Sequence, residues 1–146
     1  MTARDILDVA WDLLSGSTEA EWRAAISRAY FAAFHAARNL LRDVSFEVPR
    51  GERAHGYLWL RLSNSADAVV DHQGAQLREL RHMRNWADYD LDRPMSHMEA
   101  GVLIRVADDI VEFFETLPTV PARLKQITEA IKKYERDVLK KVTWFP

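Results

Sequence analysis

The sequence predicts an all-α fold, an up-and-down antiparallel bundle of four to five helices followed by an extra C-terminal helix. Apolar residues recur at spacings of three and four, and no run of β-branched residues alternates with period two. Hydrophobic residues make up 48% of the 146 residues and charged residues 29%, which excludes a disordered chain. Five Gly and five Pro are too few for a β-sandwich with many turns.

The composition also excludes several kinds of chemistry. The chain has no Cys, so it has no disulfide, thiolate metal site or cysteine nucleophile. A net charge of -2 excludes a polycationic nucleic-acid coat. No apolar run approaches the roughly 18 residues of a membrane span, and the first residues lack the basic-then-apolar layout of a signal peptide. We therefore expect a soluble cytoplasmic domain with no membrane partner.

The first two helices are predicted over residues 2–15 and 18–42. In the first, apolar residues share one side: Ile6, Val9, Ala10, Leu13 and Leu14. A Ser-Gly-Ser sequence ends it, and Thr18 with Glu21 then forms a capping box that starts the second. Its apolar face is rich in alanine, which allows close helix packing: Trp22, Ala25, Ile26, Ala29, Ala33, Ala37 and Leu40.

The middle of the chain predicts a loop and two more helices. Residues 43–53 contain proline and glycine and read as a loop, after which a short helix covers 54–62. We expect Asp71 to cap a long fourth helix that ends near residues 92–94, where the sequence reads Asp-Arg-Pro.

A second capping box, Ser96 with Glu99, opens the fifth helix. Its predicted apolar face is Val102, Leu103, Val106, Ile110, Phe113, Phe114 and Leu117. Pro118 and Pro121 bracket a hinge, so we divide the chain into a bundle of residues 1–118 and a C-terminal segment of residues 119–146.

The C-terminal segment is basic and amphipathic. All five Lys residues follow Pro121, and residues 121–146 carry a balance of +4 against -6 for the preceding 120. Apolar residues follow heptad spacing, which predicts a helix packed on its own domain or on a second copy: Leu124, Ile127, Ile131, Tyr134 and Val138.

Arg84 is unexpected on the apolar side of the fourth helix. It shares that side with Leu77, Leu80, Ala87 and Leu91. A guanidinium group there needs partners or a water-filled groove. Asp88 can pair with it one turn later, and Tyr89 adds a hydroxyl group. The pattern fits either a structural Arg–Asp clamp or a contact to the phosphates of RNA.

Basic and aromatic residues form a second stripe on the second helix: Arg28, Phe31, His35, Arg38 and Arg42. Such a stripe can track a nucleic-acid backbone, and it can equally be an ordinary solvated face. A comparable polar edge follows the fourth helix: Arg78, Arg81, His82 and Asn85.

Three sequence blocks resemble small HEPN-domain proteins. Residues 27–37 read SRAYFAAFHAA, which is similar to the SRAYYAAFHAA block of a bacterial and archaeal branch often found beside nucleotidyltransferases. His55 and Gly56 resemble the HG pair of that branch, and residues 84–89, RNWADY, match its RxxADY signature. The segment after Pro121 lies outside the resemblance.

The resemblance implies a HEPN-like helical bundle that forms a homodimer. It also implies roles in RNA cleavage, nucleotide binding or toxin–antitoxin pairing with a nucleotidyltransferase-like protein, without a cofactor. The residues expected to bind RNA or a partner are Arg84, Asp88, Tyr89, Arg81, Asn85, Arg28, His35 and Tyr30.

The chain departs from the catalytic members of this superfamily. Those enzymes carry Arg, four to six residues and then His near the fourth helix, and need no metal. Counted from Arg84, the corresponding positions hold Tyr89, Asp90 and Leu91. Neither Asp nor Tyr replaces imidazole near neutral pH without a large pKa shift. The remaining catalytic candidates are Arg84, Tyr89 and His55. A lone His beside apolar residues is also typical of a satisfied core or cap residue, which is the alternative interpretation of His55.

Three hypotheses follow. The first is a dimeric binding module that engages RNA, a nucleotide or a nucleotidyltransferase-like partner. The second is a metal-independent ribonuclease toxin, and the third is a purely structural dimer. We expect no metal site, because His97 and Asp108, eleven residues apart on one helix, are roughly 16 Å apart.

Overall fold

The computed structural model describes residues 1–145 and confirms the all-α prediction. Six α-helices follow one another: α1 (Ala3–Leu14), α2 (Glu19–Asp43), α3 (Arg53–Leu62), α4 (Ala68–Tyr89), α5 (His97–Thr116) and α6 (Pro121–Tyr134). A 3₁₀ turn, η1 (Leu117–Thr119), precedes α6, and a π-helical turn, η2 (Glu135–Leu139), follows it. None of the helices in residues 1–145 is long and apolar enough to cross a membrane.

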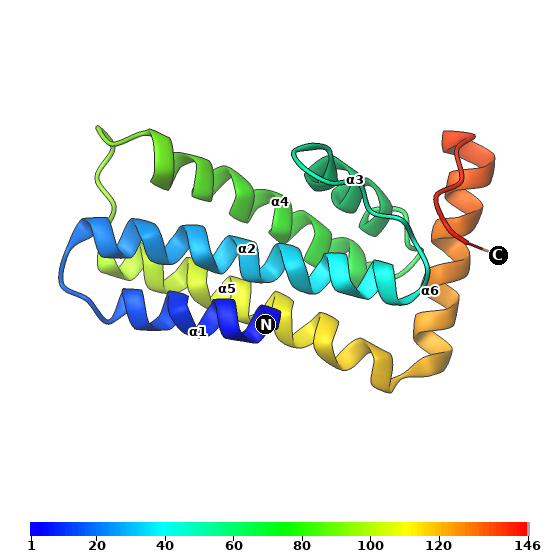
Figure 1. The fold of residues 1–146 in the computed structure, drawn as a ribbon, viewed down its shortest axis with the longest axis horizontal. Coiled ribbons are helices and arrows are strands. Elements are labelled where there is room, and N and C mark those ends of the chain that lie inside the picture. The colour runs from blue at the N-terminus through cyan, green and yellow to red at the C-terminus, as the bar shows by residue number, and fades with distance from the viewer. Residues whose placement is uncertain (146) are drawn as a thin grey trace.

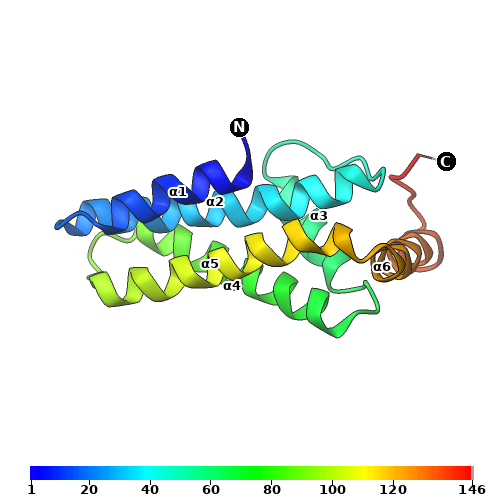
Figure 2. The same cartoon turned by 90° about the horizontal axis from the view of Figure 1, so that it is seen from below.

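The helices α1, α2, α4 and α5 lie side by side and form the bundle (Figure 1). Helix α2 contacts each of the other three and forms the centre of the bundle. The short α3 packs against α4 near the C-terminal end of α2. Helix α6 crosses the end of the bundle and is seen nearly end-on in Figure 2.

The alanine face of α2 is buried as predicted. Ala25, Ala29, Ala33 and Ala37 have no exposed surface, and their small side chains let the neighbouring helices approach closely. Thr18 and Ser96 cap their helices as predicted, since each accepts a hydrogen bond from the backbone N–H three residues later. The predicted capping boxes are incomplete, because Glu21 and Glu99 accept from the cap hydroxyls and not from the cap backbone.

The predicted start of α4 is wrong. Asp67, and not Asp71, caps the helix, because its carboxylate accepts hydrogen bonds from the backbone N–H groups of Val69 and Val70 at 3.0 and 3.1 Å. Ala66 adopts a positive φ of 56° just before the cap, which turns the chain into the helix four residues earlier than expected. Asp71 is exposed in the first turn of the helix.

Four residues predicted on apolar faces are exposed: Val9, Leu91, Val102 and Val138. Val9 and Val102 lie at the edges of their helix faces, where the packed stripe ends. Leu91 follows the last residue of α4, so the helical spacing no longer applies to it. Val138 lies in the π-helical turn, whose wider spacing breaks the heptad register after the buried Ile131.

A buried ion pair joins the C-terminal segment to α3. The Nε atom of Arg61 lies 2.9 Å from Oε2 of Glu135, which has no exposed surface. The backbone N–H and hydroxyl of Thr143 donate to the same carboxylate at 2.9 and 2.6 Å, and the hydroxyl of Tyr57 contacts that of Thr143 at 2.6 Å. The carboxylate is therefore fully satisfied by its own chain.

A second ion pair ties α6 to the start of α4. Arg123 donates two hydrogen bonds to Asp67, at 2.7 and 2.9 Å. The guanidinium group, together with the backbone donors of the helix cap, lowers the pKa of Asp67 to about 2. These two ion pairs fasten the C-terminal segment to the bundle at separate points.

Candidate functional site

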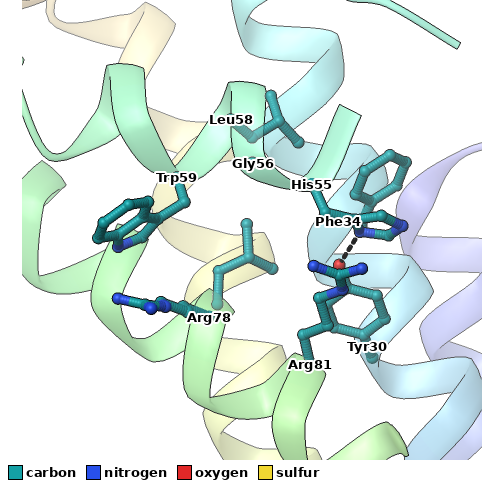
Figure 3. Close-up of a pocket in the computed structure, with 9 residues that line it drawn as sticks. Tyr30, Phe34, His55, Gly56, Leu58, Trp59, Arg78 and Arg81 are labelled. Atoms are coloured by element: carbon teal, nitrogen blue, oxygen red, sulfur yellow. Dashed lines mark hydrogen bonds between the residues drawn. The ribbon is translucent and has the colours of Figure 1, made fainter. Parts of the chain in front are cut away.

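Helices α2, α3 and α4 surround a cavity of about 190 Å³, hereafter the ring cavity (Figure 3). Helix α2 contributes aromatic rings, α3 an imidazole, a glycine and an indole, and α4 two arginines. Its lining is Tyr30, Phe34, His55, Gly56, Leu58, Trp59, Leu77, Arg78 and Arg81. Rings and guanidinium groups from three separate helices thus converge on one small space.

Tyr30 and His55 form the polar contact of the ring cavity. The hydroxyl of Tyr30 is hydrogen-bonded to Nδ1 of His55, and the two rings are stacked with centroids 5.6 Å apart. The ring of Phe34 lies 4.8 Å from that of His55 and 6.2 Å from that of Tyr30, so the three rings form one cluster. Burial raises the pKa of Tyr30, so the phenol keeps its proton at all ordinary pH values.

His55 is held in its neutral form. Burial lowers its pKa below the ordinary value, and the positive charges of Arg81 and Arg84 lower it further against the opposing effect of Glu52. At pH 7 the imidazole is therefore uncharged, with one ring nitrogen bonded to Tyr30 and Nε2 left for another partner.

Two arginines of α4 extend beside the rings. Arg81 pairs with Glu52 at 2.9 Å, and Glu52 is 84% exposed, so water weakens this pair. The guanidinium carbon of Arg78 lies 4.2 Å from the centre of the Trp59 ring, in a cation–π contact. An anion entering the cavity could take the place of Glu52 on Arg81.

The predicted pair of Arg84 and Asp88 forms, with Nε and Oδ2 2.9 Å apart. Ser27 also donates to Asp88, and Asn85 accepts from Arg84. The Arg84 side chain is 21% exposed, so it is only partly buried. The ring centroid of Tyr89 lies 5.7 Å from the guanidinium carbon of Arg84, and Tyr89 is exposed to solvent.

The structure divides the predicted site residues into three groups. Tyr30, His55 and Arg81 line the ring cavity, and the charge of Arg84 acts on the first two. Arg28 and His35 line a different hollow between α1 and α2. The third group lies at the C-terminal end of α4 and lines neither space: Arg84, Asn85, Asp88 and Tyr89. Burial lowers the pKa of His35, with further contributions from its arginine neighbours on α2.

The ring of Phe31 joins the basic stripe on α2 to the polar end of α4. The guanidinium carbons of Arg28 and Arg84 are each 5.1 Å from its centroid. Phe31 was predicted on the stripe, but the contact with Arg84 was not predictable from helical spacing.

Two aromatic residues that line the ring cavity, Phe34 and Trp59, were not predicted as site residues. One signal was present, because Trp59 follows His55 by four residues and so shares a face of the short helix. That α4 would place Arg78 against this face depends on the turn between α3 and α4, which the helical spacing does not define.

No group of three or more possible ligands in residues 1–145 is arranged to hold a metal ion. Asp108 instead pairs with Arg4 at 2.7 Å and accepts a hydrogen bond from Trp11 at 3.2 Å, while His97 bonds to the carbonyl of Leu14. These side chains have packing roles between α1 and α5.

The bundle and its three-helix cavity can now be compared with known proteins. The family model described as HEPN domain matches residues 2–117. The chain belongs to the HEPN domain family. Comparisons with curated proteins and with solved structures find no match. Membership in the HEPN family implies a module related to nucleotides or RNA, and the match ends before α6.

Proposed function

We propose that this HEPN protein is a binding module for RNA or nucleotides and that the ring cavity is its contact point. One observation carries the proposal: four rings and two guanidinium groups line a single cavity of about 190 Å³. Proteins bind unpaired bases by stacking them on aromatic and guanidinium planes, and they bind phosphates with arginine.

The size of the cavity limits what it can hold. Sites that enclose a small molecule measure about 300–1,000 Å³, so the ring cavity is too small for a whole nucleotide. It fits one base or one phosphate group, with the rest of the ligand outside. This favours a polymer or an exposed nucleotide over a deeply buried cofactor.

We further propose that the module acts as a homodimer, in a toxin–antitoxin or defence setting with a nucleotidyltransferase-like protein. The family resemblance of the three sequence blocks supports this part. The polar end of α4, with Arg84, Asn85, Asp88 and Tyr89, would then line the groove between two copies.

A metal-independent ribonuclease is the second candidate, favoured by the neutral His55 beside Arg81 and Arg84. If Nδ1–H of His55 donates to the phenol oxygen of Tyr30, Nε2 has a free lone pair. It could remove the proton of a ribose 2′-hydroxyl, whose oxygen attacks the adjacent phosphorus. The bond to the 5′-oxygen then breaks, that oxygen takes a proton from water, and the protonated His55 returns its proton to the hydroxide so formed.

The test of the binding function is the affinity of purified protein for fluorescein-labelled single-stranded RNA, measured by anisotropy. We expect Arg81→Ala to weaken binding about ten-fold, since one arginine–phosphate contact is lost. Arg105→Ala removes an exposed charge of α5 outside the ring cavity and should leave the affinity unchanged. Equal affinities of the two variants would refute the ring cavity as the contact point.

The same RNA, incubated with protein and a chelator, tests the second candidate. Cleavage by the wild type that is lost in both His55→Ala and Arg84→Ala, with both variants folded, would establish the ribonuclease. Binding without cleavage would leave the binding module as the function.

A further inference from the structure

Gly56 occupies a helical position that does not require glycine. Its φ is not positive, and a Cβ atom built there meets no atom within 4 Å. Glycine destabilises a helix interior relative to alanine, so neither the backbone nor the packing explains it. Gly74 of α4 shows the contrast, because a Cβ atom there would lie 2.9 Å from the side chain of Leu62.

Gly56 lies where two cavities meet. It lines the ring cavity, and it also lines a larger groove of about 800 Å³, hereafter the tail groove. The tail groove runs between the loop before α3, one face of α3 and the segment after α6. Its lining is Glu47, Val48, Pro49, Arg50, Arg53, Gly56, Tyr57, Leu60, Arg61, Leu139, Lys141, Val142 and Thr143. No other described residue lines both spaces.

The tail groove carries unbalanced positive charge. Arg50, Arg53 and Lys141 are exposed there, and within residues 1–145 none of the three forms an ion pair. Arg61 is already paired with the buried Glu135, and Glu47 is the one acidic residue exposed along the groove. Such a groove attracts a chain of negative charges.

We infer that single-stranded RNA crosses α3 at Gly56, with one base or phosphate in the ring cavity and its next phosphates in the tail groove. This inference rests on the proposed function. The missing side chain lets a backbone pass closely over the helix from one space to the other. Arg50, Arg53 and Lys141 are the phosphate contacts on the far side.

The shape of the track favours a single strand over a duplex. In A-form RNA the bases are stacked and paired, so none can enter a recess of about 190 Å³ lined by rings. An unpaired strand can turn one base inward and continue along a basic groove. Lys141 follows the residues matched by the family model, so this part of the track belongs to the C-terminal segment of the chain.

The test compares a fluorescein-labelled dinucleotide with a single-stranded RNA of about ten nucleotides. We expect the wild type to bind the longer RNA at least ten-fold more tightly. The double variant Arg53→Ala with Lys141→Ala should lose that advantage and keep its affinity for the dinucleotide. In the double variant the slope of log affinity against log salt concentration should become less steep by about 1.4, because each of the two lost phosphate contacts with a single strand contributes about 0.7. The control is Arg105→Ala, which should change neither.

The role of Gly56 is tested by placing side chains of increasing size at this position. Gly56→Leu places a branched side chain between the two spaces and should weaken the longer RNA about ten-fold, and Gly56→Ala should weaken it less. Both variants should melt no lower than the wild type, because glycine disfavours the helix.

The outcomes separate the two proposals. If the wild type binds both RNAs equally, or the double variant weakens both equally, the track is refuted and the binding module stands. If poly-glutamate displaces the longer RNA as well as unlabelled RNA does, the groove binds an acidic protein and the track is refuted. If the wild type binds neither RNA, the proposed function fails and this inference with it.

Discussion

Two regions of the molecule use arginine in opposite ways. At the junction between α3 and the C-terminal segment, Arg61 is buried against a carboxylate that has no exposed surface. Beside the ring cavity, Arg78 and Arg81 lie against a ring and against an exposed carboxylate. The first guanidinium group has a partner in the protein that it cannot exchange, whereas the others can exchange theirs for a ligand.

A fourth arginine, Arg23, also belongs to the structural kind. Arg23 is buried and donates to the backbone carbonyls of Ala87 and Asp90, each at 3.0 Å, at the end of α4. These carbonyls have no partner within the helix, so the side chain satisfies them. Burial with a complete set of partners in the protein therefore distinguishes a structural arginine from one whose guanidinium group is accessible to a ligand.

The largest effect should come from Glu135→Ala. It leaves Arg61 buried without its carboxylate, and breaking such a pair costs about 3–5 kcal/mol of unfolding free energy. Urea denaturation followed by circular dichroism measures the loss. The matched control is Glu129→Ala on α6, where a 58% exposed carboxylate lies 4.0 Å from Lys132 and should contribute less than about 1 kcal/mol.

A double variant tests whether the unpaired buried charge causes the loss of stability. Replacing both partners, Arg61→Met with Glu135→Leu, removes the buried charges together and should recover most of the stability. If the unfolding free energy of Glu135→Ala lies within about 1 kcal/mol of the wild-type value, the contrast between the two regions is wrong.

Arg84→Ala should have a smaller effect on stability and a larger one on binding. Its ion pair with Asp88 is 21% and 26% exposed, so solvent screens it, and we expect a loss of about 1 kcal/mol in unfolding free energy. The affinity for single-stranded RNA should fall about ten-fold. A large loss of stability with unchanged affinity would instead assign Arg84 to the structural group.

The helices were predictable because their signals are local. The alanine face of α2 and the helix caps at Thr18 and Ser96 depend on residues within one or two turns. The start of α4 was missed for a related reason: Asp67 and Asp71 both suit a cap, and the positive φ of Ala66 decides between them. Backbone conformation in a turn is not readable from helical spacing.

The buried arginines were not predictable in the same way. Arg84 drew attention in the sequence because it shares a helix side with apolar residues, and its partner could be named because Asp88 lies four residues later. The partner of Arg61 lies 74 residues away in the C-terminal segment. The ring cavity likewise brings together Tyr30, His55 and Arg81 from three helices. The family resemblance pointed to the blocks that hold Tyr30 and His55, whereas Arg81 lies outside those blocks. The packing of α3 on α4 defines the space between the three side chains.

The smallest effect is a pH dependence at His55. Burial, together with Arg81 and Arg84, lowers its pKa in the folded protein, so the unfolded chain binds the proton more readily. The contribution of the neutral His55 to the unfolding free energy is fully present above the ordinary histidine pKa of about 6.5. It falls as the pH drops from there through the lowered pKa of the folded protein. His55→Gln should flatten this part of the stability curve.

Nuclear magnetic resonance titration of the imidazole ring tests the cause. The His55 signal should titrate below pH 6.5, and Arg81→Ala should move its midpoint upward because one positive charge is removed. His35 is the internal control, since the charges that lower its pKa belong to Arg38 and Arg28. A phosphate bound beside Arg81 would also raise the pKa of His55, so RNA should bind more tightly as the pH falls toward that value. If Arg81→Ala leaves the His55 midpoint unchanged, the charge of Arg81 does not reach the ring cavity. Arg81 would then not be an arginine available to a ligand there.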